Sequence, residues 1–169
     1  MSYDIFFVPY RLAEEPIETT NPFTGEQTLN RDGTISENEV QAVREVLNLW
    51  KSKVPTLGDI NFEMPDGGIA SICQHDYATG LMVEIRGAGI TPAVASLLHE
   101  LLSVASWAMA PVDENMYNIV NSDEKLNEMN TDLREYGNAI VCESPSMLVA
   151  LLNEGFEAWQ EYRDKVKKQ

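Results

Sequence analysis

The chain has few of the residues that usually carry covalent or redox chemistry. Its 169 residues include only two cysteines and two histidines. Cys73 and Cys142 each stand in an apolar, strand-like segment, which predicts two free, buried thiols in a reducing compartment. So few cysteines exclude a disulfide framework as the organising element of the fold, while a single bridge between the two stays open as an alternative.

The scarcity of histidine also limits metal chemistry. His99 begins the segment HELLS, but Ser103 occupies the position where a zinc-protease helix places its second histidine. A zinc ion needs three or four converging side chains. The chain also lacks a G-x-S-x-G segment, a P-loop and any paired-cysteine motif. We therefore predict no metal and no cofactor.

Positive charge and long apolar runs are scarce as well. The chain has 12 Lys and Arg against 27 Asp and Glu, a net charge of −15, which disfavours direct binding to nucleic acid or to an anionic membrane. The longest stretch poor in charge, residues 87–112, is interrupted by His99 and Glu100 and predicts a buried helix rather than a membrane span. The first apolar run, IFFV, is too short for a secretory leader. We expect a soluble, cytoplasmic protein.

The segment NRDGTISENEV, residues 30–40, matches the second half of an EF-hand calcium loop. With Gly33 at the turn, Asp32 and Glu39 fall on ligand positions, yet Thr28 stands where the loop requires its first aspartate. The same residues predict a turn followed by a capping box, in which Ser36 and Glu39 satisfy each other's backbone N–H groups. We predict the start of a helix here, not a calcium site.

Hydrophobic periodicity predicts strands and helices along the whole chain. Strands are expected at residues 3–9, 60–64, 69–74, 80–86, 116–120 and 139–142, with a short one near 27–30. Helices are expected from about residue 37 to 53 and from residues 92, 122 and 145, the last bent or split at Gly155. A meander with two strand–helix–strand crossovers predicts the α+β class. We expect one domain, residues 1–169, with a mixed, largely antiparallel sheet and about four helices packed on it.

One group of residues raises the alternative of a small enzyme or ligand-binding domain. Cys73 and His75 lie two apart on a predicted strand, so they share a face, and Arg86 ends another strand of the same meander. Side chains at i and i+2 lie farther apart than a nucleophile and its base need to be. This alternative requires a deep pocket lined by Cys73, His75 and Arg86.

The acidic charge is concentrated in residues 111–154. Nine carboxylates stand there against Lys125 and Arg134 alone. Such a segment is typical either of a solvated surface or of a surface that docks a basic protein, with charge steering the encounter. The carboxylates that would form this surface are Asp113, Glu114, Asp123, Glu124 and Glu128.

The opening MSYDIFFVPY, the small size, the acidic charge and the α+β order together resemble the bacterial immunity proteins that neutralise partner toxins. The resemblance implies a cytoplasmic, non-enzymatic inhibitor that masks a toxin's active surface, often the basic cleft of a nuclease. It assigns no functional residue by motif. A purely structural or oligomer-forming protein fits the same sequence.

Overall fold

The computed structural model describes residues 3–58, 60–73 and 76–168. It is an α+β fold with one large mixed sheet of eight strands and a separate two-stranded hairpin. The expected number of about four helices is wrong, because the described residues form six α-helices and one π-helix. None of the helices among them combines the length and the apolar character required to cross a membrane.

The large sheet takes strands from most of the chain. Its spatial order is β10-β9-β8-β1-β7-β6-β5-β4. The strands are β1 (Tyr3–Pro9), β4 (Thr56–Leu57), β5 (Asn61–Glu63), β6 (Gly68–Ile72), β7 (Leu81–Gly87), β8 (Trp107–Pro111), β9 (Tyr117–Val120) and β10 (Asn138–Val141). The helices are α1 (Glu37–Lys53), α2 (Pro92–Ser103), α3 (Asp123–Glu128), α4 (Thr131–Tyr136), α5 (Pro145–Val149), the π-helix η1 (Ala150–Glu154) and α6 (Phe156–Lys167).

Strand β1 lies at the centre of this sheet. It pairs antiparallel with β7 on one side and with β8 on the other, so that Phe6 faces both Met82 and Ala110. Because both neighbours oppose β1, β7 and β8 run in the same direction, and α2 is the crossover between them. A second crossover, made of α3 and α4, joins the parallel pair β9 and β10.

The sequence pattern misses β8, which was expected to lie in a buried helix. Trp107 and Met109 point into the main core, while Ala108 packs into a second core with Tyr10, Val120 and Met129. A strand buried on both faces carries no alternation of polar and apolar residues, so its period cannot be read from the sequence.

Two predicted helices are divided. The segment after Ser122 ends at Met129, which is extended, and the Asn130 side chain caps a new helix by accepting from the Leu133 backbone N–H. The last helix is interrupted by η1 and by Gly155, whose φ of 93° lies in the left-handed region.

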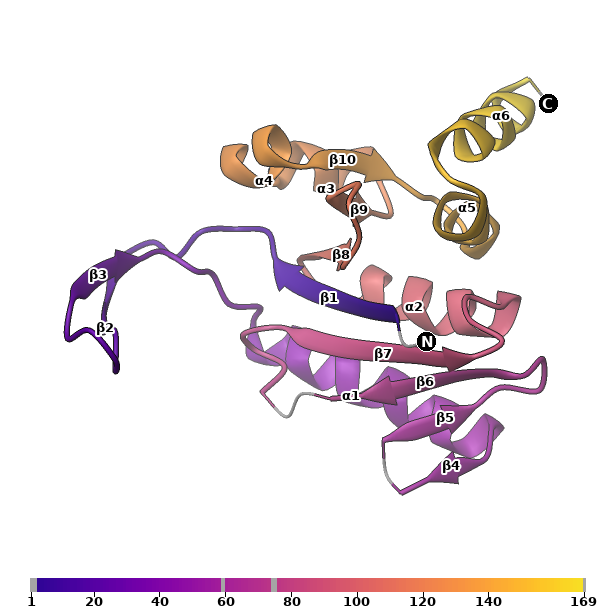
Figure 1. Ribbon diagram of the computed structural model, residues 1–169, viewed down its shortest axis with the longest axis horizontal. Helices are drawn as coiled ribbons and strands as arrows, with labels where there is room; N and C mark the ends of the chain where they lie inside the picture. Colours follow the sequence, from indigo (N-terminus) through magenta and orange to yellow (C-terminus); the bar gives the residue numbers. More distant parts are fainter. Residues whose placement is uncertain (1–2, 59, 74–75, 169) are drawn as a thin grey trace.

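The helices cover the two faces of the sheet unequally (Figure 1). α1 and α2 lie behind β1, β7, β6 and β5, where apolar side chains of helices and strands form the main core. The other face is covered only near β8, β9 and β10, by α3 and α4, whose side chains close the second core. No helix of the described residues lies on the opposite face of β1, β7 and β6.

Residues 12–33 form an arm that leaves the sheet after β1 (Figure 1). Its strands β2 (Ile17–Thr20) and β3 (Gln27–Asn30) pair with each other and, within the part of the chain that the structure describes, with no other strand. The turn is closed by Asn21, whose side chain accepts from the Phe23 backbone N–H. Apolar side chains on the arm remain exposed, including Phe23, at 96%, and Leu29, at 73%.

The capping box predicted from residues 36–39 is confirmed. Ser36 Oγ accepts from the Glu39 N–H at 3.2 Å, and Glu39 Oε2 accepts from the Ser36 N–H at 2.7 Å. The second carboxylate oxygen, Oε1, accepts from the Ser106 N–H at 2.7 Å, just before β8. Burial raises the pKa of Glu39, but the hydrogen bonds from Ser106 and Ser36 outweigh it and lower the pKa below its usual value. One carboxylate thus starts α1 and fixes it to β8.

We expect Glu39→Ala to lower the free energy of unfolding by about 1–3 kcal/mol, because two backbone N–H groups lose their acceptor. Urea unfolding followed by circular dichroism measures the change. Glu45→Ala, at an exposed position of the same helix, is the matched control and should change stability by less than about 0.5 kcal/mol. Equal effects of the two substitutions would contradict the tie between α1 and β8.

Candidate functional site

The candidate site begins with the helix-free side of the central strands, which we call the bare face: Asp4, Phe6, Val8, Ile69, Met82, Glu84 and Arg86. Successive side chains of a strand point to opposite faces. Ile5 and Phe7 are therefore buried under the helices, while Phe6 and Val8 are 38% and 37% exposed. Two exposed apolar residues at the centre of a sheet form a ready contact surface for another molecule.

The bare face places two carboxylates side by side. Asp4 on β1 is the direct partner of Glu84 on β7. Like charges directly opposite each other across two strands destabilise a sheet. Arg86 lies two residues along β7 and forms an ion pair with Glu84 at 2.6 Å. Among the described residues Asp4 has no such ion pair, so its charge is available to a cationic partner.

Two hollows adjoin the bare face on either side of α4. The first, the arm hollow, has a volume of about 510 Å³ and is lined by Val8, Leu12, Ile17, Asp32, Asp132 and Leu133 among others. The second, the β9 hollow, has a volume of about 400 Å³ and is lined by residues that include Ala110, Asp113, Met116, Asp132 and Leu133. Asp132 and Leu133 line both hollows, while Val8 and Ala110 connect them to Phe6.

The bare face and the two hollows thus form one continuous area, which we call the docking surface. It contains large apolar side chains that are more than a third exposed: Phe6, Val8, Leu12, Ile17 and Met116. Its carboxylates are Asp4, Asp32, Asp113, Asp132 and Glu84. The cations of this surface, Arg11 and Arg86, are each paired with a glutamate. Exposed apolar groups therefore lie here beside carboxylates that form no ion pair among the described residues, an arrangement typical of a protein–protein interface.

The five carboxylates predicted from the acidic segment do not form one patch. Asp113 and Glu114 precede β9, and Asp113 lines the β9 hollow. Asp123 and Glu124 follow β9, so the strand separates the two pairs by about 13 Å, at roughly 3.3 Å per residue. Asp123 shares a different hollow with Arg163 and Lys167 of α6. Asp113 therefore belongs to the docking surface and Glu114 is its neighbour in the chain, while the second pair lies at the far end of β9.

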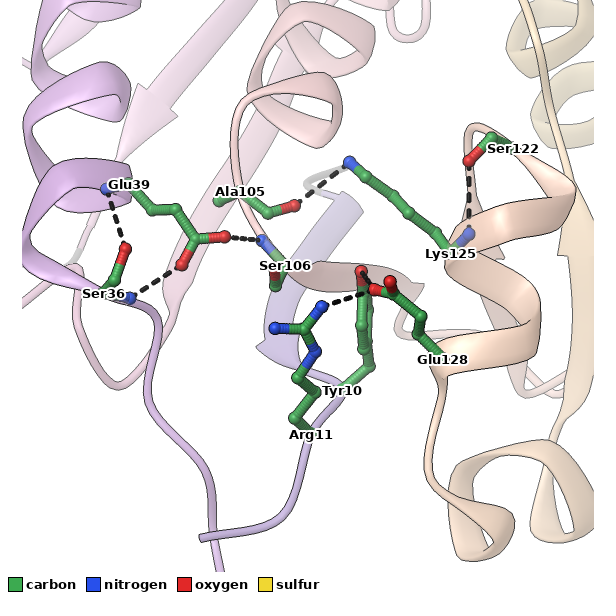
Figure 2. A network of polar contacts seen from close by, with 9 residues as sticks. All are labelled: Tyr10, Arg11, Ser36, Glu39, Ala105, Ser106, Ser122, Lys125 and Glu128. Carbon is green, nitrogen blue, oxygen red and sulfur yellow. Dashed lines mark hydrogen bonds and ion pairs between the residues drawn. The ribbon is translucent and has the colours of Figure 1, made fainter.

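The fifth carboxylate, Glu128, is exposed but forms an ion pair and a hydrogen bond with residues of this same chain (Figure 2). Its Oε2 pairs with the Arg11 guanidinium at 2.5 Å and accepts from the Tyr10 hydroxyl at 3.1 Å. The Arg11 hydrogen bond, followed by that of Tyr10, lowers the pKa of Glu128. Glu128 thus fixes the root of the arm to α3, and it also neutralises a cation that lines the arm hollow.

Two residues of the enzyme alternative, Cys73 and Arg86, are not brought together. The Cys73 backbone N–H bonds to the Met82 carbonyl, whereas Arg86 is paired with Ile69 four residues further along β7, a distance of about 13 Å. Cys73 is exposed, and Arg86 is held by Glu84. His75 lies outside the described residues. Within the described part of the chain, no three His, Cys, Asp or Glu side chains form a group able to hold a metal ion.

Sequence reasoning did not identify Phe6 and Val8 as site residues. The segment YDIFFVP predicts a strand, but its apolar residues are consecutive, so the pattern assigns all of them to the core. Asp4 could have identified them, because it lies two residues before Phe6 and four before Val8 and so shares their face of the strand. A carboxylate on that face marks it as the more solvent-exposed one.

Comparisons of the chain with protein-family models, with curated proteins and with solved structures find no match.

Lys125, on α3 beside this site, has a structural role. Its ammonium donates to the carbonyl of Leu102 at 2.6 Å, at the end of α2. It also donates to the carbonyl of Ala105 at 3.1 Å, just beyond that helix (Figure 2). Cations near a helix C-terminus satisfy its free carbonyl groups. Burial lowers the pKa of Lys125 to about 8, although the charges of Glu39 and Glu128 oppose the shift.

This shift predicts a rise in stability in mildly alkaline solution. Between a folded pKa of about 8 and an unfolded value of 10.5, the unfolded chain binds the extra proton, so the free energy of unfolding increases with pH. We expect a slope below about 1.4 kcal/mol per pH unit, because Lys125 is partly exposed. Urea unfolding at pH 8, 9 and 10 should show a rise in the wild type that is lost in Lys125→Met. Parallel pH curves for the two proteins would refute this origin.

Proposed function

We propose that this protein is a non-enzymatic binding protein and that its docking surface takes a basic protein partner. The observation that carries the proposal is the bare face of β1, where exposed Phe6 and Val8 lie in line with Asp4. Apolar side chains supply affinity once water is excluded, and surrounding carboxylates select and steer a cationic partner.

A second copy of this chain is a poorer occupant for the same surface. Each copy carries a net charge of −15, and a symmetric contact would bring the carboxylates of both docking surfaces together. Like charges facing each other across an interface cost several kcal/mol. A partner with basic residues around an apolar centre offsets that charge, so the acidic character of the chain favours a different protein.

In its most concrete form, the proposal is that the protein is a cytoplasmic immunity protein that neutralises a toxin. Covering a cationic active surface, such as the basic cleft of a nuclease, would block access of the toxin's polyanionic substrate. Asp113 and Glu114 act with Asp4, Asp32 and Asp132 in this proposal. Glu128 supports the surface through Arg11, and Asp123 and Glu124 are peripheral to it.

The first experiment identifies the partner and tests the face. The tagged protein is used to capture partners from lysate of its native host, and the captured protein is purified for affinity measurement. We expect Phe6→Ser/Val8→Ser to weaken binding at least about tenfold, the loss expected from removing central apolar contacts. The control is Leu49→Ser/Leu57→Ser, which removes side chains that are 50% and 62% exposed elsewhere. Equal losses of affinity in both double variants, or a captured partner that is acidic, would refute the proposal.

A second experiment tests the charge at the docking surface. Binding to the captured partner should weaken as salt concentration rises, because salt screens exposed charges. Asp4→Asn should reduce this salt dependence, whereas Glu124→Gln, at an exposed carboxylate beyond β9, should leave it unchanged. If Glu124→Gln has the larger effect, the acidic segment rather than the bare face carries the interaction.

The toxin hypothesis has its own readout. Expression of the captured partner alone should arrest growth of the host, and co-expression of this chain should restore it. Phe6→Ser/Val8→Ser should fail to restore growth although it accumulates to the same level. If expression of the partner does not arrest growth, toxin neutralisation is refuted, whereas the proposal that the docking surface binds a basic protein is not.

A further inference from the structure

A third hollow lies on the helix-covered side of the sheet, away from the docking surface. It has a volume of about 310 Å³ and opens between α1 and the strands β5 and β6. Arg44, Asn48 and Lys51 of α1 form one wall, since positions i, i+4 and i+7 share a helix face. Tyr77 forms part of the rim. We call this site the cationic hollow.

The floor of the cationic hollow is apolar. Leu47, Phe62 and Ile72 line it, and these side chains are 5%, 0% and 3% exposed. Ile60, which is 41% exposed, stands at its edge. Because the three floor side chains are already buried, the apolar surface that a ligand would remove from water is mainly that of Ile60, which offers a contact for a hydrocarbon group beside the charged wall.

The two cations at the wall have no counter-ion among the described residues. The ion pairs among the described residues lie elsewhere and involve other cations: Arg11 with Glu128, Arg86 with Glu84, and Arg163 with Asp164. Arg44 and Lys51 therefore direct two positive charges to one hollow in a chain of net charge −15. A guanidinium group and an ammonium group around a small space can hold a carboxylate through charge-assisted hydrogen bonds.

Two neutral donors complete the polar side of the hollow. The Asn48 amide lies between Arg44 and Lys51 along the helix, and Tyr77, from the segment after β6, also lines the hollow, within reach of the Arg44 charge. Burial raises the pKa of Tyr77, although the nearby Arg44 charge opposes the shift. The phenol therefore stays protonated at neutral pH and is able to donate a hydrogen bond.

We propose that the cationic hollow binds a small organic carboxylate whose apolar body, an aromatic ring or a short aliphatic chain, packs against Ile60 at the edge of the apolar floor. The volume lies at the lower end of the range for small-molecule sites, about 300–1,000 Å³, which suits a compact ligand of this kind. This site is independent of the proposed docking function, because it uses the other side of the sheet and different residues.

The test is an NMR titration of the full-length, ¹⁵N-labelled protein with phenylacetate and with hexanoate. At least one of them should produce saturable shifts at the backbone amides of Arg44, Asn48, Lys51 and Tyr77. Phenylacetamide and hexanamide, the neutral amides of similar shape, should bind at least about tenfold more weakly. Equal binding of acid and amide, shifts centred elsewhere, or no saturable shift with either acid would overturn the proposal.

Variants separate a specific site from general attraction to positive charge. Arg44→Gln and Lys51→Gln should each weaken binding of the responding acid about tenfold. Arg134→Gln, at an exposed arginine on α4, is the matched control and should leave binding unchanged. Arg44 and Lys51 are exposed, so their variants should keep the wild-type urea midpoint. A control variant that binds as weakly as the other two would show that the acid responds only to overall charge.

Discussion

The pairing of β1 with two strands from distant parts of the chain is the constraint on which the rest of the structure depends. Tyr3–Phe7 pairs with Leu81–Ile85, and Ile5–Pro9 pairs with Trp107–Pro111. Without β1, the antiparallel meander β4–β7 and the block β8–β10 would have no shared edge. Its register also decides the chemistry of both faces, since a shift of one residue would exchange buried Ile5 and Phe7 for Asp4, Phe6 and Val8.

The unequal distribution of helices follows from the same arrangement. α2 must cross from β7 to β8 and so covers the face that holds Ile5 and Phe7, while α3 and α4 cross from β9 to β10 on the other face. α3 and α4 are short helices of six residues each, and they reach no further than the end of β8. The bare face is therefore a consequence of topology, and the two hollows mark the point where the covering helices stop.

The sequence was sufficient for the elements whose pattern is local. The meander, the β1 segment and the Ser36–Glu39 capping box all depend on residues close together in the chain. β8 could not be predicted, because Trp107, Ala108 and Met109 are buried on both faces and show no alternation. The candidate site could not be predicted from the sequence for a related reason. Asp113 and Asp123 are near in sequence but lie at opposite ends of β9, and Asp4 meets Glu84 only through long-range strand pairing.

The central place of β1 also affects how the chain is made. β1 precedes both of its partners in the chain, and its second partner, β8, ends at Pro111. The second edge of β1 therefore stays unpaired until that residue has left the ribosome. During this interval the alternating side chains of β1, including Phe6 and Phe7, have no complete set of neighbours. Exposed strands of this kind associate readily with other chains. The order of synthesis therefore supplies β7, which covers one edge of β1, before it supplies β8, which covers the other.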